Sequence, residues 1–280
     1  MKTQITTIAA AVAFAMSTAA SAQYWAGSDS TIEQEGDNNT NNITQMGTQE
    51  SRVYQEGDYN TTSVTQDDIS GVATIRPGLN ESGIEQIGQG NTANVTQLGA
   101  FNDSTVYQEN DNNTATVNQK GFDNVAVTEQ IGNFNSANVT QDGVWNDSYA
   151  FQEGSNNSAT VSQDGFNNKS VVEQIGDFNN AEITQNGEWN DNYTYLGGNN
   201  NTAVVGQYGE GLESTILATG DYNTHNIMQS GKGHDSYTST TGSYNQQNVA
   251  QSGSFWGGAQ HTSTITTNGN NNTNTVAQGH

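Results

Sequence analysis

The chain has 280 residues, of which 31% are hydrophobic and 12% charged, and its formal net charge is −23. The negative charge argues against nucleic acid and anionic membrane surfaces as direct partners, because both attract basic proteins. A composition this polar ordinarily indicates disorder, and a chain without cysteine cannot be stabilised by disulfides. Any order in this chain must therefore come from its sequence pattern.

The first 22 residues have the pattern of a secretory signal peptide. Lys2 supplies the positive start, an apolar stretch runs from Ile5 to Met16, and small residues precede a cleavage point between Ala22 and Gln23. The apolar stretch is too short to span a bilayer, so we expect no integral membrane segment. These features predict a secreted chain, with a short N-terminal segment at 23–27 before the repeats.

From residue 28 to residue 280, glutamine recurs at a fixed spacing. Between Gln86 and Gln185 it returns every 11 residues. Each segment reads approximately Asn-x-Ser/Ala-x-Val/Ile-x-Gln-x-Gly, as in the stretch from Asn135 to Gly143. First halves favour Ser before the aliphatic position and second halves favour Ala, so the complete unit is 22 residues long. Such repetition indicates a stack of near-identical units.

The alternation within each half has a period of two, which is the signature of a β-strand. Ser/Ala, Val/Ile and Gln then share one face, while Gly and Asn close the strand in a tight turn. Two short strands cannot bury their apolar face alone, so the units must stack. We therefore predict an all-β fold: a two-sheet, cross-β solenoid of about eleven 22-residue strand-turn-strand-turn coils.

Two regions interrupt the repeat. Residues 67–79, which include the single proline Pro77, predict a loop insertion, and residues 254–262 predict an irregular region. In the later coils other residues replace the first glutamine, and we expect the C-terminal third to pack less tightly. These replacements are Leu196, Ala218, Thr240 and Thr267.

The repeated amides are the candidate functional residues. Buried amides must be hydrogen-bonded, and a glutamine stacked on another can donate to one neighbour and accept from the other, as in cross-β structures. We interpret the interior glutamines and the turn asparagines as a ladder for self-assembly. The glutamines are Gln34, Gln45, Gln55, Gln66, Gln86, Gln97, Gln108, Gln119, Gln130, Gln141, Gln152, Gln163, Gln174, Gln185, Gln207, Gln229, Gln251 and Gln278. The asparagines are Asn39, Asn60, Asn91, Asn113, Asn135, Asn157, Asn179, Asn201, Asn223, Asn245 and Asn272.

The sequence suggests no catalytic, cofactor-binding or metal site. The histidines His225, His234, His261 and His280 have no metal-ligand spacing, so we expect them to be solvated. Acidic residues on a regular rod form a solvated surface, and the turns lack the aspartate-rich nonapeptide of calcium-binding solenoids. We therefore predict a protein that is not an enzyme and that carries no cofactor.

One outward position alternates between acid and aromatic residues, from Glu33 and Tyr54 to Glu173 and Tyr195. Stacked in register, this alternation avoids a ladder of adjacent like charges, which would destabilise the sheet. It could also form an adhesive face or a face for packing between rods. We favour the structural interpretation.

Several coils share the spacing Gln-x-Gly-x2-Asn-x-Ala-x3-Gln. It is present in Gln130, Gly132, Asn135, Ala137 and Gln141, and again from Gln174 to Gln185. This pattern resembles the curlin repeat of the curli subunits, and the resemblance covers roughly residues 28–280.

The resemblance implies an extracellular functional amyloid at the cell surface. In that family the subunits leave the periplasm through a dedicated outer-membrane channel. A surface-bound nucleator then templates them into fibres for biofilm and adhesion. The partners implied are the chain itself, related curli subunits (a nucleator or a major subunit), the secretion channel and a periplasmic chaperone.

Two other functions compete with a self-assembling subunit. One is a monomeric or nucleating β-solenoid, acting as an adhesin or binding rod on the cell surface. An ice-binding rod is disfavoured because its row of outward threonines is interrupted, for example at Asn118 and Ser162. The other is a polysaccharide-cleaving β-helix, for which coils of 22 residues are too small.

Overall fold

The computed structural model describes residues 27–67, 79–253 and 260–279. In these residues it contains 22 β-strands and no helix, arranged as two 11-stranded sheets. The odd sheet contains β1 (Asp29–Glu35), β3 (Glu50–Glu56), β5 (Glu81–Ile87), β7 (Asp103–Glu109), β9 (Val125–Asn133), β11 (Asp147–Ser155), β13 (Lys169–Ile175), β15 (Asp191–Gly197), β17 (Glu213–Thr219), β19 (Asp235–Thr241) and β21 (Thr262–Asn268). The even sheet contains β2 (Thr40–Met46), β4 (Thr61–Asp67), β6 (Thr92–Ala100), β8 (Thr114–Phe122), β10 (Ser136–Val144), β12 (Ser158–Phe166), β14 (Asn180–Glu188), β16 (Thr202–Glu210), β18 (Thr224–Lys232), β20 (Gln246–Ser252) and β22 (Thr273–Gly279).

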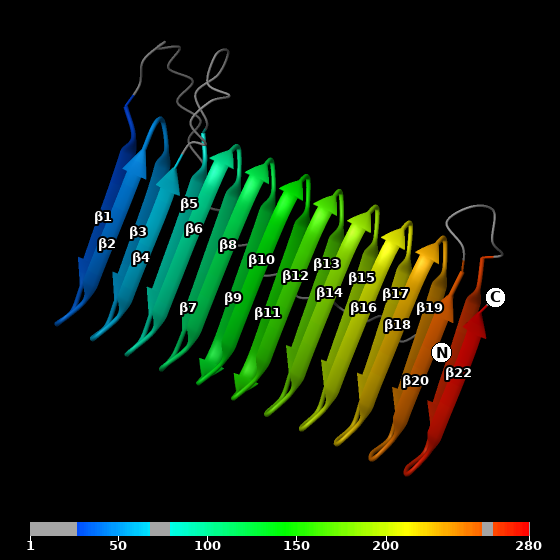
Figure 1. Ribbon diagram of the computed structural model, residues 1–280. Helices are drawn as coiled ribbons and strands as arrows, with labels where there is room; N and C mark the ends of the chain where they lie inside the picture. The colour runs from blue at the N-terminus through cyan, green and yellow to red at the C-terminus, as the bar shows by residue number, and fades with distance from the viewer. Residues whose placement is uncertain (1–26, 68–78, 254–259, 280) are drawn as a thin grey trace, which may run out of the picture.

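The strands stack into a rod in which each strand pairs in parallel with the strand two places further along the chain (Figure 1). We call each pair of one odd and one even strand a coil, so that β1 and β2 form coil 1 and β21 and β22 form coil 11. At a strand spacing of about 4.8 Å the rod is on the order of 50 Å long. The predicted two-sheet β-solenoid is confirmed.

The register places identical residue types directly above one another. Val139 pairs with Val161, and Gln141 pairs with Gln163. Alternate residues of each inner strand are buried, so the aliphatic, small and glutamine positions all face the interior between the sheets. The predicted inward face is therefore correct, and the core is a thin layer of stacked rows.

Two kinds of turn connect the strands. At the first corner an odd strand turns into the even strand of the same coil, as in Gly132 to Asn135. At the second corner an even strand turns into the next odd strand, as in Gly143 to Asn146. The turns begin with a residue at positive φ, which is usually glycine and adopts that conformation at little cost. At Gly143, where φ is 133°, an added Cβ would lie 1.9 Å from the carbonyl oxygen of Gly165.

Burial of the interior positions does not decrease from coil 8 to coil 10. The side chains that replace glutamine there are buried as completely as the glutamines, with Leu196 and Ala218 both 0% exposed. The prediction of looser packing is therefore wrong for burial, because the apolar replacements fill the same interior row. Only the terminal coils lack cover, as the 48% exposure of Ile32 shows.

The predicted segment boundaries fall mainly outside the described residues. This holds for the signal peptide 1–22 and for most of the N-terminal segment 23–27. Asp67 is the last residue of β4 and Thr262 is the first of β21. The remainder of the predicted insertion and irregular region falls largely on 68–78 and 254–259, which are not among the described residues.

Candidate self-assembly site

The interior glutamines of the odd sheet form a hydrogen-bonded ladder. Nε2 of each glutamine donates to Oε1 of the glutamine in the next coil toward the C-terminus, as from Gln108 to Gln130 at 2.8 Å. The ladder stops where the next strand carries Leu196 in this position. It runs through Gln34, Gln55, Gln86, Gln108, Gln130, Gln152 and Gln174, with distances of 2.7–2.8 Å.

The even sheet carries a second ladder that reaches both ends of the rod. It has the same polarity, as in the bond from Gln119 Nε2 to Gln141 Oε1 at 2.9 Å. Every predicted glutamine of this sheet takes part. The ladder runs through Gln45, Gln66, Gln97, Gln119, Gln141, Gln163, Gln185, Gln207, Gln229, Gln251 and Gln278, at 2.7–3.0 Å.

The glutamine amides also join the two sheets. Besides its ladder bond, Gln130 Nε2 donates to the carbonyl oxygen of Thr114 at 3.0 Å, and Gln141 Nε2 donates to that of Val125 at 2.8 Å. Each of these contacts crosses from one sheet to a strand of the other. A fully buried amide is thus satisfied along the rod and across it, which removes the desolvation penalty of burying a polar group.

The predicted turn asparagines form a third ladder at the first corner. The backbone N–H of Asn135 donates to Asn113 Oδ1 at 3.0 Å, and Asn135 Nδ2 donates to the carbonyl oxygen of Gly154 at 2.8 Å. Each asparagine side chain therefore satisfies the backbone of the next coil toward the C-terminus, and its own backbone N–H is satisfied by the asparagine of the preceding coil. The series is Asn39, Asn60, Asn91, Asn113, Asn135, Asn157, Asn179, Asn201, Asn223, Asn245 and Asn272.

The two ends of the rod expose the ladders with opposite chemistry. Among the described strands, β1 and β2 each pair on one side only, as do β21 and β22 at the other end (Figure 1). Because every bond of the two glutamine ladders points toward the C-terminus, the N-terminal coil presents glutamine carbonyl oxygens and the C-terminal coil presents a glutamine N–H. Unpaired strand edges of this kind are templates for another chain.

The sequence model of the curlin-associated repeat matches residues 111–143, 132–165 and 154–187. This stretch of the chain therefore consists of curlin-associated repeats. The matched residues run from the first corner of coil 4 to β14, within the part of the rod (coils 1 to 7) in which both glutamine ladders are present. No curated protein matches the chain.

The curlin-repeat rod contains a fourth ladder that sequence reasoning missed. At the second corner, the backbone N–H of Asn124 donates to Asn102 Oδ1 at 3.2 Å, and Asn124 Nδ2 donates to the carbonyl oxygen of Gly143 at 3.0 Å. The regular spacing of 22 residues was a signal that could have revealed this series. Its members are Asn80, Asn102, Asn124, Asn146, Asn168 and Asn190.

Two histidines are buried, contrary to the expectation of solvated side chains. His225 takes the small interior position of β18, next to Ala203, with Nδ1 3.1 Å from Thr238 Oγ1. Burial lowers the pKa of His225 to about 4. His234 replaces a second-corner asparagine, where its Nδ1 accepts the backbone N–H of His261 at 3.1 Å. Both histidines occupy positions that the 22-residue repeat spacing places in the interior. This placement overrides the usual preference of histidine for solvent.

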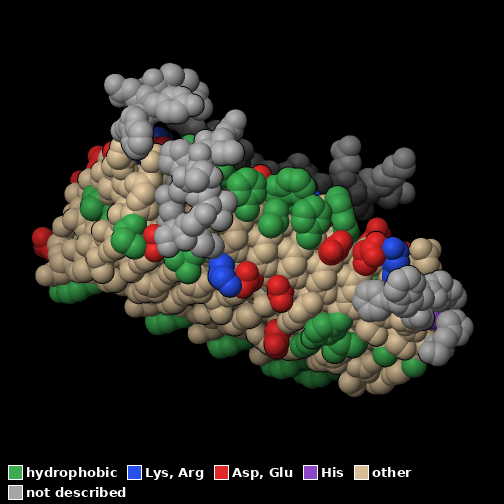
Figure 2. Space-filling model, turned by 45° about the horizontal axis from the view of Figure 1, so that its top comes forward, with side chains coloured by type: hydrophobic (Ala, Val, Ile, Leu, Met, Phe, Trp, Pro, Cys, Tyr) green, Lys and Arg blue, Asp and Glu red, His purple; other side chains and the backbone are tan. Residues whose placement is uncertain are grey.

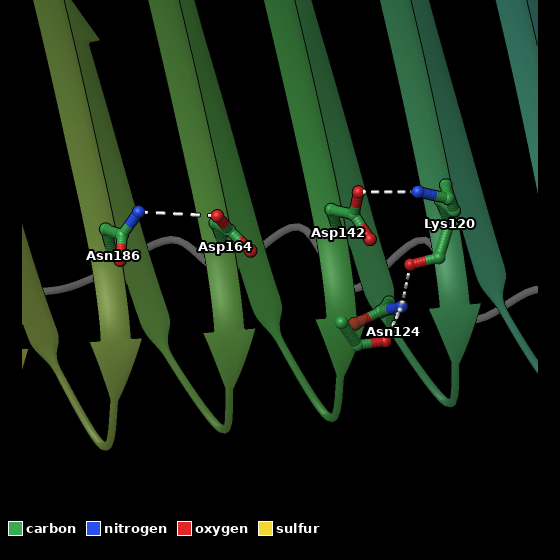
Figure 3. Close-up of polar contacts among 6 residues, drawn as sticks. Lys120, Asn124, Asp142, Asp164 and Asn186 are labelled. Atoms are coloured by element: carbon green, nitrogen blue, oxygen red, sulfur yellow. Dashed lines mark hydrogen bonds and ion pairs between the residues drawn. The ribbon is translucent and has the colours of Figure 1, made fainter.

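The outward face carries ordinary surface pairs between neighbouring strands. Lys120 Nζ lies 2.9 Å from Asp142 Oδ2, and Asn186 Nδ2 donates to Asp164 Oδ2 at 3.3 Å (Figure 3). Exposed pairs of this kind contribute little to stability. In the same row Asp142 pairs directly with Asp164, so each of these two neighbouring carboxylates has a cationic or amide partner on its other side.

The predicted alternation of acid and aromatic residues is present on the odd sheet. Glu129 stacks between Tyr107 and Phe151, and the hydroxyl of Tyr149 donates to Glu129 Oε2 at 2.8 Å. Partial burial raises the pKa of Glu85 and Glu173 in the same row. The interleaving separates these carboxylates, as the structural interpretation requires.

Among the described residues, no group of three or more His, Cys, Asp or Glu side chains could hold a metal ion. The described part of the chain also contains no helix that is long and apolar enough to cross a membrane.

Proposed function

We propose that this curlin-repeat protein is a secreted structural subunit that assembles into extracellular, curli-like amyloid fibres for biofilm matrix and surface adhesion. One observation carries the proposal. The even-sheet ladder runs without a break from Gln45 to Gln278 and meets the two ends of the rod with complementary groups.

Head-to-tail stacking continues this ladder from one molecule to the next. When β22 of one copy pairs with β2 of another in the register of the inner strands, Gln278 Nε2 faces Gln45 Oε1. Stacking of two identical ends would instead oppose two carbonyl oxygens or two N–H groups. The polarity of the ladder therefore favours polar, head-to-tail growth.

The resemblance to curli subunits supports the cellular setting of this proposal. Residues 1–22 would direct export, with cleavage between Ala22 and Gln23. A periplasmic chaperone and an outer-membrane channel would then deliver the chain to the cell surface. Its partners there would be further copies of itself and related curli subunits. The curlin-repeat family and the solenoid fold also suggest a protein that is not an enzyme.

A nucleating or monomeric rod is the second candidate, and one observation favours it. The odd-sheet glutamine ladder reaches the N-terminal coil but not the C-terminal one, where Thr267 occupies its position. Thr267 Oγ1 already accepts bonds from Gln247 and Asn274, both at 2.8 Å. One end is thus a better template for glutamine-ladder growth than the other, as a nucleator would require.

The experiment that tests the proposal follows residues 23–280 after dilution from denaturant, using thioflavin T fluorescence and fibre diffraction. We expect a lag, then growth, with reflections near about 4.7 and 10 Å. A soluble monomer with β-type circular dichroism that neither fibrillises nor extends seeds would reject a fibre subunit in favour of the binding rod.

A further inference from the structure

Aromatic residues occupy costly backbone positions at the corners of the rod. Outside glycine, the described residues with positive φ are of two kinds only, Asn or Asp and aromatic. Asn and Asp tolerate this left-handed conformation, whereas bulky side chains rarely adopt it. The aromatic residues are Tyr59, Phe101, Phe134, Trp145, Phe178, Trp189, Tyr222 and Tyr244, with φ between 56° and 60°. Such outliers point to a function for the side chain.

At the first corner the aromatic rings form an exposed row with gaps. Phe134 and Phe178 are 60% and 58% exposed, and Asn156 occupies the equivalent position in the coil between them. Backbone bonds hold the row in register: Asn156 N–H donates to the carbonyl oxygen of Asn133, and Phe178 N–H to that of Ser155, both at 3.0 Å. Figure 2 shows separate hydrophobic groups along the lower edge of the rod.

The second corner shows what fills such a gap. There Phe166, from the intervening coil, lies between Trp145 and Trp189, with ring centroids 5.1 and 5.5 Å away. Phe122 contacts Phe101 in the same way at 5.2 Å. These distances are those of favourable aromatic pairs. The rings on that edge thus form two contacting groups, Phe101 with Phe122 and Phe166 with both tryptophans, and Figure 2 shows the hydrophobic side chains gathered there.

No aromatic rings fill the gaps of the first-corner row. When the row is read in reverse, however, its rings fall where the forward row has gaps. Rings stand at coils 2, 5, 7, 9 and 10 (Tyr59, Phe134, Phe178, Tyr222 and Tyr244), and Asn or Gly stands at coils 3, 4, 6, 8 and 11 (Gly90, Asn112, Asn156, Asn200 and Asn271). Consider a second copy that is turned end for end, so that its coil 7 lies opposite coil 6 of the first copy. Every ring of one copy then faces a coil of the other copy that has no ring. The two rows together then place one ring at each level from coil 2 to coil 11.

We propose that a second copy of the chain docks antiparallel along this edge, so that the two first-corner rows interdigitate. The contact is isologous, with a two-fold axis between coils 6 and 7. Neighbouring rings would be one coil apart, about 4.8 Å. Tyr222 and Tyr244, which are one coil apart in the chain itself, stack at 4.9 Å with nearly parallel planes. A parallel pair shifted by one coil would instead bring two rings to the same level.

This lateral contact goes beyond the proposed head-to-tail growth, because it joins the sides of rods and not their ends. Acidic residues beside the rings oppose it: Asp37, Asp58, Asp111, Asp177 and Asp221 lie on the same corner. Screening of these charges should strengthen pairing, so the test uses an ionic strength of about 1 M, where the Debye length is about 3 Å.

The first test reads the mass of the soluble chain by sedimentation, with three double variants. F134N/F178N removes two rings and inserts the residue that the chain uses in its own gaps. N156F/N200F fills two gaps with the residue found at the neighbouring ring positions. W145N/W189N, on the opposite corner, is the matched control.

Interdigitation predicts that the first two double variants weaken dimerisation by about tenfold or more and that the control does not. F134N/F178N loses ring contacts, and N156F/N200F places rings of the two copies at the same level. Tighter association of N156F/N200F would overturn the proposal, because it would indicate a nonspecific apolar patch. Equal loss in the control would also overturn it. The circular dichroism of each variant checks that the fold is kept.

A second test fixes the orientation with single cysteines, which is simple because the chain has none. In the antiparallel pair, two copies of Asn156→Cys lie one coil apart along the axis and should react with a short bis-maleimide. Two copies of Asn112→Cys lie five coils apart, about 24 Å, and should not react. Equal cross-linking at both positions would indicate a parallel pair, and none at either would exclude the contact.

The test of lateral pairing can succeed or fail independently of the test of fibre assembly. Fibres that grow without cross-linking at Asn156→Cys would retain head-to-tail assembly and reject lateral pairing. Cross-linked dimers that never extend into fibres would retain the pairing and reject the fibre subunit.

Discussion

Gln174 and Leu196 occupy the same interior position in the paired strands β13 and β15, and the amide ladder of the odd sheet ends between them. Gln174 Nε2 keeps its cross-sheet bond to the carbonyl oxygen of Ser158 at 2.9 Å. In the even sheet, at the same level of the rod, the ladder continues from Gln185 to Gln207 at 2.8 Å. The two sheets are therefore unequal, and only the even sheet can carry a glutamine ladder across a head-to-tail junction.

The junction should accordingly depend on the even sheet. We predict that Gln45→Ala and Gln278→Ala each slow the elongation of wild-type seeds, because each removes one partner of the intermolecular amide bond. Gln34→Ala should have a smaller effect, since it would face Thr267 and not a glutamine. Thioflavin T kinetics with equal seed mass measure the difference. Equal slowing by Gln34→Ala and Gln45→Ala would contradict this assignment.

Glycine at the corners should be far less replaceable than glycine within a strand. Gly143→Ala places a Cβ against the carbonyl oxygen of Gly165 in the next coil, so we expect a loss of at least about 3 kcal/mol in the free energy of unfolding. Gly83→Ala, in β5, meets nothing within 4 Å and should stabilise the chain by about 0.5 kcal/mol. Urea unfolding of the soluble chain measures both. A harmless Gly143→Ala would refute the close corner packing.

The interior serines should contribute little as hydrogen-bonding groups. The buried hydroxyl of Ser104 has no hydrogen-bond partner within the described residues, so Ser104→Ala should be neutral or stabilising by up to about 1 kcal/mol. Gln108→Ala, two rows away on the same strand, should cost about 3 kcal/mol, because it leaves a cavity and breaks the ladder. A comparable loss from both variants would show that the hydroxyl row matters as much as the amide row.

Acid should weaken the coils around His225. Its pKa in the folded chain is about 4, below the ordinary value of 6.5, so the unfolded chain binds the proton more tightly between these two values. His225 therefore does not reduce the free energy of unfolding above pH 6.5. As the pH drops to 4, protonation of His225 in the unfolded chain lowers this free energy by about 3 kcal/mol.

The carboxylates with raised pKa values act in the opposite direction. Glu81, Glu85 and Glu173 are destabilised as charged groups by burial, so the fold gains stability as the pH falls through their raised pKa values toward 4.5. The comparison that isolates the histidine is wild type against His225→Ala, both unfolded in urea at several pH values. Parallel pH profiles would show that His225 does not titrate in this way.

The regular part of the fold could be read from the sequence because position in the repeat decides burial. The alternation around Val139 and Gln141 predicts both the strand and its inward face, and the 22-residue period predicts the register. The same repeat spacing, applied to every position regardless of residue type, places His225 and His234 in the interior. It also reveals the second-corner asparagines. Residue type misled the prediction at those positions, because histidine on its own is a surface residue.

The corner aromatics could not be predicted in the same way. The repeat spacing places Phe134 and Trp145 in turns, but a left-handed backbone conformation is ordinarily assigned to Gly or Asn. Whether rings in such turns point out and leave gaps depends on the three-dimensional stack. The end of the odd-sheet ladder at Leu196 is visible in the sequence, whereas the polarity of the amide bonds is not.

The most direct test of head-to-tail growth is a mixed-disulfide experiment across the junction. Thr275 in β22 and Asn42 in β2 hold equivalent outward positions, three residues before Gln278 and Gln45. Fibres grown from a mixture of Thr275→Cys and Asn42→Cys chains should form disulfide-linked dimers, because neighbouring strands bring such a pair within bonding range. Fibres of either variant alone should form none. Cross-linking within a single-variant fibre, or fibres of the mixture without any disulfide, would contradict coil-on-coil, head-to-tail assembly.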